Sequence, residues 1–252
     1  AKTLGYVTSS ARAAKAKIDV TLNTTALSSA TIPAGTVFTT TVDTVPFQFV
    51  TAADITKSNT GSGIPFVSTD IYEGTFVTTR YTVDTSDVEQ RFLLTDNRAD
   101  TTSLLVKVQT SSADSTTNTF TEATDITQVT SSSNVYFLQE VEAGLFEVYF
   151  GDGVIGTSLS DGNIVLLTYV VSNKTAANGA SVFTSAAAIA TVTDVSVATA
   201  SNASAGAEAE SLASIKYNAP LDYASQGRCV TAEDYKVFVK RFFSSTQSVQ
   251  VF

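Results

Sequence analysis

The chain has 252 residues, a formal net charge of -9 and only 15% charged residues. Such an acidic chain has no general attraction for nucleic acid or anionic lipid, and no apolar run approaches the roughly 18 residues of a membrane-spanning helix. The lack of His and the single cysteine, Cys229, exclude a Ser-His-Asp or Cys-His catalytic group and any intrachain disulfide.

Apolar residues that alternate with polar ones predict strands along the first two hundred residues. The segment Lys15–Thr25 alternates through Ile18, Val20 and Leu22, which is the period of a half-buried strand. Pro33 predicts a turn before the next strand. Further strands are expected from residue 37, within 46–55, around 72, over 76–83 and on both sides of an Asp/Asn turn in 89–109.

The second hundred residues add a hairpin and a central strand. Two apolar and aromatic runs, 134–142 and 145–151, flank Ala143 and Gly144, which predicts a hairpin. The run Ile164–Val171 is the most apolar in the chain, and its continuity predicts a strand buried on both faces. Polar loops are expected over 111–133, and another strand within 188–200 precedes a small-residue loop at 203–209.

The last fifty residues change to a helical pattern. Leu212, Ile215 and Lys216 recur at helical spacing in a helix that is expected to stop at Pro220. A second helix follows Thr231, with the order helix, loop, helix and a final strand at 248–252. The predicted fold class is therefore mainly β with a small α+β carboxy-terminal unit. Three domains are expected, at 1–110, at 111–202 with the hairpin at 145–171, and at 203–252, the last incomplete at its end.

The start of the second helix carries a capping pattern. Thr231 is placed to cap it, and Asp234 stands three residues later, as in an acidic relative of the capping box. Tyr235, Phe238 and Val239 then form an apolar face, so core packing is one interpretation of Tyr235 and Phe238.

The glycine-rich stretch FGDGVIG poses the question of a phosphate site. Gly151, Gly153 and Gly156 have the spacing of a dinucleotide-binding fingerprint, but no helical pattern follows to hold a pyrophosphate. Asp152-Gly153 is instead a turn dipeptide of the kind that closes hairpins. No cofactor or metal is predicted.

Two stretches go beyond composition. In 146–180, a Phe-Gly-Asp-Gly turn precedes a Tyr-containing apolar strand, and 206–241 holds a longer ordered motif. Its positions here are Glu210, Ser211, Ile215, Lys216, Ala219, Pro220, Gln226, Gly227, Arg228, Val230, Thr231, Asp234 and Tyr235. Together the stretches resemble the baseplate J-like family of contractile-tail phages, and most closely the wedge subunits of T4-like baseplates. The resemblance implies a fragment of the carboxy-terminal half.

The resemblance implies a structural role in the virion and no enzymatic activity. Such subunits join neighbouring wedges into a ring around the hub, pair with copies of themselves, contact other wedge proteins, and rearrange when the sheath contracts. They belong to the phage tail baseplate and assemble in the host cytoplasm. The resemblance implies no cofactor and no contact with nucleic acid or membrane.

Interface residues are expected in the carboxy-terminal unit. The candidates are Lys216, Tyr217, Arg228, Tyr235, Lys240 and Arg241. Turn or structural roles are expected for Gly151, Asp152, Gly153, Pro220 and Gly227. Arg228 could equally brace its loop through backbone carbonyls. The small-residue loop 203–209 is a candidate hinge between the β body and the helices.

Two other classes of function stay open at this point. A carbohydrate-binding β-rich surface adhesin fits the Thr/Ser content and the acidic pI, although the chain has no Trp for a sugar platform. A glycosidase that uses two carboxylates is the third possibility, because 24 acidic residues offer many pairs and none lies in a distinctive motif. The few cationic residues gather at 12–17 and 236–241, which leaves a local contact with an acidic partner open.

Overall fold

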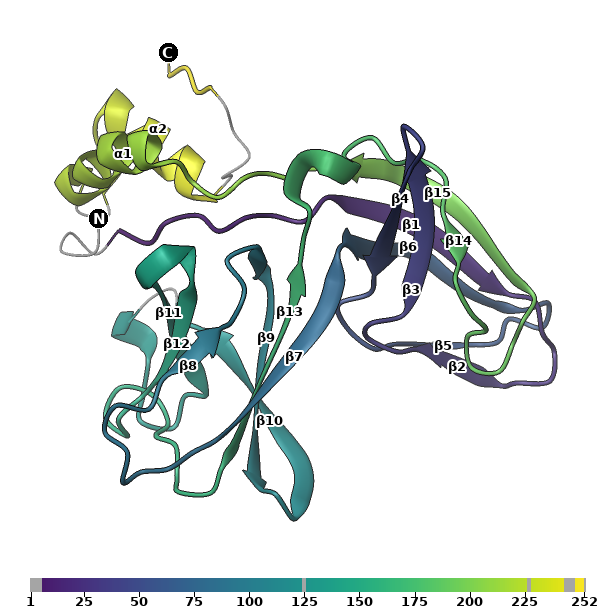
Figure 1. The fold of residues 1–252 in the computed structure, drawn as a ribbon, viewed down its shortest axis with the longest axis horizontal. Coiled ribbons are helices and arrows are strands. Elements are labelled where there is room, and N and C mark those ends of the chain that lie inside the picture. Colours follow the sequence, from purple (N-terminus) through teal and green to yellow (C-terminus); the bar gives the residue numbers. More distant parts are fainter. Residues whose placement is uncertain (1–5, 124–125, 226–227, 243–247, 252) are drawn as a thin grey trace.

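A computed structural model describes residues 6–123, 126–225, 228–242 and 248–251. The molecule consists of two β bodies set at an angle and a pair of helices, and the segment before β1 runs from the helix pair to the first body (Figure 1). The predicted fold class is confirmed, because most elements are strands and the two helices stand near the carboxy-terminal end.

The first sheet combines strands from both ends of the chain. Its order is β14-β3-β4-β6-β1-β15, and the curled sheet brings β14 and β15 onto the two walls of one pocket. The bounds are β1 Lys15–Leu22, β3 Val37–Val42, β4 Val45–Val50, β6 Ile64–Glu73, β14 Thr184–Ser185 and β15 Val195–Ser204. A separate two-stranded sheet beside it pairs β2 Ser29–Ile32 with β5 Ile55–Ser58.

The second sheet uses the middle of the chain, in the order β7-β13-β9-β10-β11-β12-β8. Its edge strands also approach each other, since the Tyr81 hydroxyl of β7 donates to the Leu93 carbonyl of β8 over 2.8 Å. The bounds are β7 Thr75–Thr82, β8 Phe92–Leu94, β9 Ala99–Ser111, β10 Asp114–Glu122, β11 Val135–Glu140, β12 Phe146–Phe150 and β13 Ile164–Val171. The helices are α1 Leu212–Ser225 and α2 Ala232–Phe242, with short 3-10 turns at Ile126–Gln128, Glu142–Gly144 and Lys174–Ala177.

The alternating pattern of the first strand is confirmed. Ile18, Val20 and Leu22 of β1 are fully buried in the first core, while the residues between them are partly or fully exposed. This follows from the period of two along a strand, which sends successive side chains to opposite faces. β1 lies between β6 and β15, so a strand from the start of the chain is paired with one from residue 195 onward.

The hairpin and the central strand are also confirmed. β11 and β12 pair antiparallel, and Ala143 and Gly144 between them adopt positive φ values of 59° and 74°. The run Ile164–Val171 forms β13, which pairs with β7 on one side and β9 on the other. Six of its eight residues are buried and the other two, Leu166 and Thr168, are partly exposed, which is the exposure expected of a strand paired on both sides.

Proline does not end the first helix. Pro220 lies inside α1, which continues to Ser225, so the predicted end of the helix at Pro220 is wrong. A proline inside a helix removes one backbone hydrogen bond and crowds the preceding turn. Here Ala219 and Ser225 are buried on either side of it, and the Ser225 hydroxyl donates to the Asp222 carbonyl over 2.8 Å. The packing of this last turn therefore outweighs the free-energy cost of a proline inside the helix.

The turn in FGDGVIG exists but does not close the expected hairpin. Asp152 Oδ1 accepts the backbone N–H groups of Val154 and Ile155 over 2.9 and 3.0 Å, and Gly153 has a φ of 87°. The strand before the turn, β12, pairs with β11 and β8, whereas the strand after it, β13, pairs with β7 and β9. The chain therefore crosses the sheet at this turn, because the partners of β13 come from further back in the sequence.

Other expectations also differ from the observed elements. The polar segment expected as loops holds β10, of which only Phe120 is buried. Residues 248–251 form no strand, so the expected final strand is absent from the part of it that is described. The expected boundary at 110/111 falls inside β9 and that at 202/203 inside β15. β1 pairs with β15, which is far away in the sequence, and local composition gives no sign of such a pairing.

A single glycine separates β6 of the first sheet from β7 of the second. β6 ends at Glu73 in the first sheet and β7 begins at Thr75 in the second, with Gly74 between them at a φ of 127°. A Cβ atom at Gly74 would collide with the backbone carbonyl of Val171, where β13 leaves the second sheet. The outgoing and returning chains are therefore packed backbone against backbone at this crossing, which only glycine permits.

Glu73 stabilises the same contact between the end of β6 and the chain that leaves β13. Its side chain is fully buried, and its carboxylate accepts the backbone N–H and the side-chain Nδ2–H of Asn173 over 2.8 and 2.7 Å. Burial raises the pKa of Glu73 above its ordinary value, while the two hydrogen bonds from Asn173 act in the opposite direction. One acidic side chain thus joins the end of β6 to the segment that returns from β13.

We predict that Gly74→Ala destabilises the protein more than a glycine-to-alanine substitution whose only penalty is a positive φ angle. Gly61 is the matched control, because it has a φ of 101° and nothing within 4 Å of an added Cβ. Gly61→Ala should cost about 1–2 kcal/mol from backbone strain alone. Gly74→Ala adds a collision with backbone and should cost at least about 3 kcal/mol in urea unfolding. Equal losses in the two variants would contradict the close crossing.

Candidate functional site

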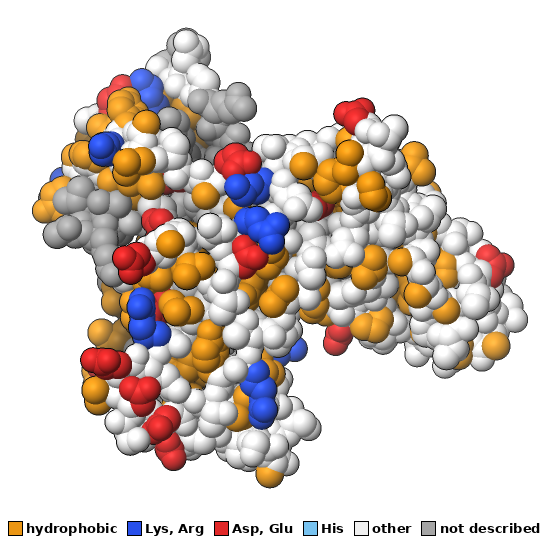
Figure 2. Space-filling model, in the orientation of Figure 1, with side chains coloured by type: hydrophobic (Ala, Val, Ile, Leu, Met, Phe, Trp, Pro, Cys, Tyr) orange, Lys and Arg blue, Asp and Glu red, His pale blue; other side chains and the backbone are white. Residues whose placement is uncertain are grey.

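The predicted interface residues gather on the helix pair. Lys216 and Tyr217 lie on α1, Arg228 precedes α2, and Tyr235 lies in the first half of α2; all four are exposed. The side chains of Lys240 and Arg241, and the whole of Gly227, lie outside the described residues. Figure 2 shows hydrophobic side chains at the surface of this unit, at the upper left of the molecule.

α1 exposes an apolar stripe along one side. Leu212, Tyr217 and Tyr223 are 66%, 63% and 59% exposed. Residues 212, 216, 220 and 223 follow the spacing of one helix face, and all of them are exposed. We call Leu212, Lys216, Tyr217, Pro220 and Tyr223 the outer face of α1. Leu212 and Tyr223 were not predicted from the sequence, although the spacing that links them to Lys216 is visible there.

The predicted cap of α2 is confirmed in both directions. The Asp234 backbone N–H donates to Thr231 Oγ1 over 3.2 Å, and the Thr231 backbone N–H donates to Asp234 Oδ2 over 2.9 Å. The hydrogen bond from the Thr231 backbone, followed by one from Val230, holds the pKa of Asp234 below its ordinary value. Tyr235 is 47% exposed, so the alternative interpretation that placed it in a core is wrong. Phe238 is half-buried.

Glu210 attaches α1 to the start of the chain. Its Oε1 accepts the Ser214 hydroxyl over 2.7 Å and Asn218 Nδ2–H over 3.1 Å, both from α1. The Tyr6 hydroxyl lies 3.0 Å from both carboxylate oxygens, and the Glu210 backbone N–H donates to the Ser9 carbonyl over 3.0 Å. Burial, and then the charge of Glu210, raise the pKa of Tyr6, so the phenol stays protonated and keeps donating at neutral pH.

The candidate hinge at 203–209 is tied to its surroundings at several points. Arg12 and Ala207 exchange both backbone hydrogen bonds, over 2.9 and 3.1 Å. Lys174 pairs with Glu208 over 2.6 Å, and a Cβ atom at Gly206 would collide with the Lys174 carbonyl. Movement at this segment would therefore require breaking two backbone hydrogen bonds and an ion pair.

Two of the basic residues near the start of the chain, Lys15 and Lys17, form ion pairs within the chain. Lys15 and Lys17 each place Nζ 3.0 Å from the Asp70 carboxylate. Near the other end, Lys236 pairs with Glu233 over 2.7 Å. These acidic neighbours reduce the positive potential that an acidic partner would meet.

One pocket of about 260 Å³ at the second sheet has the chemistry closest to a catalytic site. Asp87 and Glu147 both line it. The Glu147 carboxylate is held by Arg91 over 2.9 and 2.7 Å, and its Oε2 also accepts the Tyr149 hydroxyl over 2.8 Å. Both oxygens of this carboxylate are therefore already engaged by neighbouring side chains.

The described residues show neither a metal cluster nor a membrane-spanning helix. No three His, Cys, Asp or Glu side chains among them come together as a possible metal site. None of the described helices has the length and apolar character needed to cross a membrane.

Residues 77–184 match the family model described as the bacteriophage baseplate wedge protein gp6, third domain. The resemblance to baseplate wedge subunits is confirmed. The baseplate wedge protein gp6 of Enterobacteria phage T4 is 28% identical over 48% of this chain. The alignment covers 22% of that relative, so this chain spans about a fifth of its matched relative's length. The gp6 third-domain match begins in β7 and ends in β14.

We predict that Glu210→Gln loosens the helix pair from the start of the chain. The neutral amide has one acceptor oxygen in place of two, and it weakens the hydrogen bonds from Tyr6, Ser214 and Asn218. Amide hydrogen exchange in α1 should rise about tenfold, the effect of losing one to two kcal/mol of charge-assisted bonding. Glu208→Gln is the matched control, because Glu208 makes one exposed ion pair and should leave α1 exchange unchanged. Equal exchange in the two variants would contradict the role of Glu210.

Proposed function

We propose that this chain is a structural part of a contractile-tail phage baseplate wedge and acts by contact with neighbouring polypeptides, without catalysis. The match of 77–184 to the gp6 third domain is the observation that carries this proposal. The identity to the T4 baseplate wedge protein gp6 supports it. The chain's place would then be the tail baseplate of the virion, after assembly in the host cytoplasm.

The finer part of the proposal is that copies of the subunit pair and, with other wedge proteins, link wedges into a ring around the hub that rearranges on sheath contraction. The outer face of α1 supports pairing. Two tyrosines, a leucine and a proline share an exposed stripe with one charged residue, Lys216. Aromatic side chains of this kind are enriched at protein interfaces and charged ones are depleted. The candidates Lys216 and Tyr217 lie on this face, whereas Tyr235 and Arg228 lie on or next to α2.

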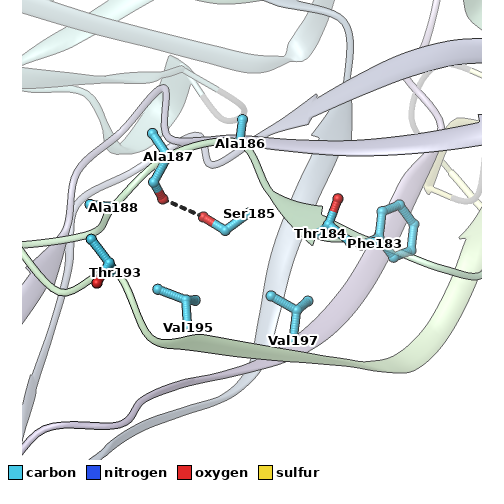
Figure 3. Close-up of a pocket in the computed structure, with 9 residues that line it drawn as sticks. All are labelled: Phe183, Thr184, Ser185, Ala186, Ala187, Ala188, Thr193, Val195 and Val197. Carbon is cyan, nitrogen blue, oxygen red and sulfur yellow. Dashed lines mark hydrogen bonds between the residues drawn. The ribbon is translucent and has the colours of Figure 1, made fainter.

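The alternative of a carbohydrate-binding adhesin has less support. The pocket of about 380 Å³ at the first sheet is lined by one aromatic residue, Phe183 (Figure 3). Phe183 is buried and packs edge-on against Phe49, with ring centroids 4.9 Å apart. A sugar platform needs an exposed aromatic face. This pocket does not offer one.

We predict that the chain self-associates through the outer face of α1. Light scattering over a concentration series should show a dimer for the unchanged chain and a monomer for the double variant Leu212→Asp, Tyr223→Asp, because two carboxylates would be buried without partners. Val88→Asp is the control, since Val88 is 95% exposed in a loop of the second body and should leave the dimer intact. Dimers in all three proteins would exclude α1 as the contact, and a monomeric unchanged chain would remove pairing from the proposal.

A further inference from the structure

The described chain passes four times between the first β body and the rest of the molecule (Figure 1). Ala14 leads into β1, and Gly74 separates β6 from β7. Residues 172–174 follow β13, and residues 204–206 lead from the end of β15 to the helices. We call these four segments the joint. Any change of angle between the first body and its neighbours must take place in them.

The segments of the joint are in direct contact. The Glu73 N–H donates to the Ala14 carbonyl over 2.8 Å, and the Glu73 carboxylate holds Asn173. A Cβ atom at Gly206 would collide with the Lys174 carbonyl and would lie 3.1 Å from the Ala14 Cβ. Backbones that approach this closely leave no room for independent movement, so a change in one segment displaces the others.

Two residues of the joint, Lys174 and Ala205, have a backbone conformation that residues with a Cβ atom avoid. Their φ values are 63° and 66°, in the left-handed region where the Cβ atom comes too close to the following carbonyl oxygen. Asp43 and Thr44 also have positive φ, but they form the two-residue turn between β3 and β4, which requires it. Lys174 and Ala205 connect no hairpin, so their surroundings must hold them in this conformation.

Asn178 holds the segment at Ala205. Its Oδ1 accepts the Gly206 N–H over 2.9 Å, and its Nδ2–H donates to the Gly206 carbonyl over 3.0 Å. The side-chain amide thus takes the place of the backbone of a neighbouring strand. Ser204 and Ala207, on either side, pair with the start of β1 and the segment before it. Ala205 is therefore fixed by its neighbours, while its own side chain is exposed.

An extended conformation of Ala205 is compatible with the pairing on both sides of it. Ser204 pairs with Lys15, and Ala207 pairs with Arg12. Two residues thus separate the paired positions on each segment, so Ala205 can extend without a shift of register. The free-energy cost of a positive φ in alanine and the gain from two hydrogen bonds are similar in size. The strained and the extended arrangement therefore lie close in free energy, as a switch between two states requires.

We propose that the joint is a two-state hinge in which Asn178 holds Ala205 in its strained conformation. Release of Asn178 lets Ala205 extend and turns the helix pair relative to the first body. Lys174 takes part through the contact of its carbonyl with Gly206 and through its ion pair with Glu208, both on the helix side of Ala205. The hinge is a property of one chain and goes beyond the proposed function, to which it adds the place of a rearrangement.

The test measures the distance between the first body and the helix pair in the whole chain. Spin labels on Cys229, the only cysteine, and on Val67→Cys in β6, which is 69% exposed, give this distance by double electron–electron resonance. Asn178→Ala removes both hydrogen bonds to Gly206, and the population at a second distance should rise about tenfold. Asn202→Ala is the matched control, because it removes an exposed amide of β15 outside the joint and should leave the distance unchanged.

Substitutions of Ala205 separate a strained hinge from general loosening. Glycine adopts a positive φ without cost, so Ala205→Gly should reverse the effect of Asn178→Ala about tenfold, even though glycine makes a chain more flexible. Ala205→Val should populate the second distance with Asn178 intact, because β-branched residues disfavour positive φ. The Ala205 side chain is exposed, so neither change disturbs a core. Ala205→Val also decides the question if the Asn178→Ala chain does not fold.

Three results would overturn the proposal. One is a distance distribution that stays the same in both Asn178→Ala and Ala205→Val. Another is a second distance in Asn202→Ala as well, which would mean a general loosening of β15. The last is a second distance in Asn178→Ala that Ala205→Gly leaves unchanged or increases. Because the test follows one isolated chain, none of these results bears on the wedge proposal, which rests on the family match.

Discussion

The segment Tyr6–Ala14 holds the two sheets and the helix pair in one arrangement, because its hydrogen bonds go to all three. Tyr6 and Ser9 meet Glu210 at the start of α1, Thr8 donates to Glu140 of β11 over 2.6 Å, and the Ala13 N–H donates to Asp100 of β9 over 2.9 Å. The chain then enters the first sheet as β1. An extended segment that passes three bodies must satisfy its polar groups along the way. Each body supplies hydrogen-bond partners for a different part of it, and the partner from the first sheet is the Glu73 N–H, which donates to the Ala14 carbonyl over 2.8 Å.

Each β body has its own apolar core, and the two cores are separate. One core lies within the first sheet and another within the second, and only a small cluster of Ala13, Val50 and Val170 lies at their junction. Directional contacts therefore carry much of the orientation between the bodies, among them the bonds from Asn173 to buried Glu73 and the close packing at Gly74. Hydrogen bonds define an angle more sharply than apolar area does, and a few of them can be exchanged for others. Such a junction suits a subunit that must hold a fixed geometry and, as we propose, later adopt another.

Local pattern was sufficient for the elements whose causes are local. The alternation in β1, the continuous apolar run of β13, the hairpin at Ala143-Gly144 and the cap at Thr231 all depend on neighbours within a few residues. The pairing of β1 with β15, the strand β10 in a polar segment and the continuation of α1 through Pro220 depend on contacts with distant residues. The sequence placed Lys216 and Tyr217 in the candidate site but missed Leu212 and Tyr223, because an exposed face is recognised only once the helix length and its packed side are known. The pocket between β14 and β15 could not be predicted at all, since it arises from which strands fail to pair.

The family match and the proposed contacts occupy different parts of the molecule. The match ends at residue 184, inside β14, and covers the second sheet with the chain that returns from it. The outer face of α1 lies beyond it, and so does the edge of β15, while the match ends in β14, which also forms one wall of the pocket of about 380 Å³. In this arrangement the second sheet is the part of the chain that matches the family model. The first sheet and the helices surround it with an uncharged strand edge and an exposed aromatic stripe, two surfaces that differ in chemistry and would select different partners. We propose that the chain is part of a wedge subunit with several neighbours. Such a subunit needs surfaces that do not compete for one partner, and a backbone edge and a helix face meet that requirement because each recognises a different secondary structure.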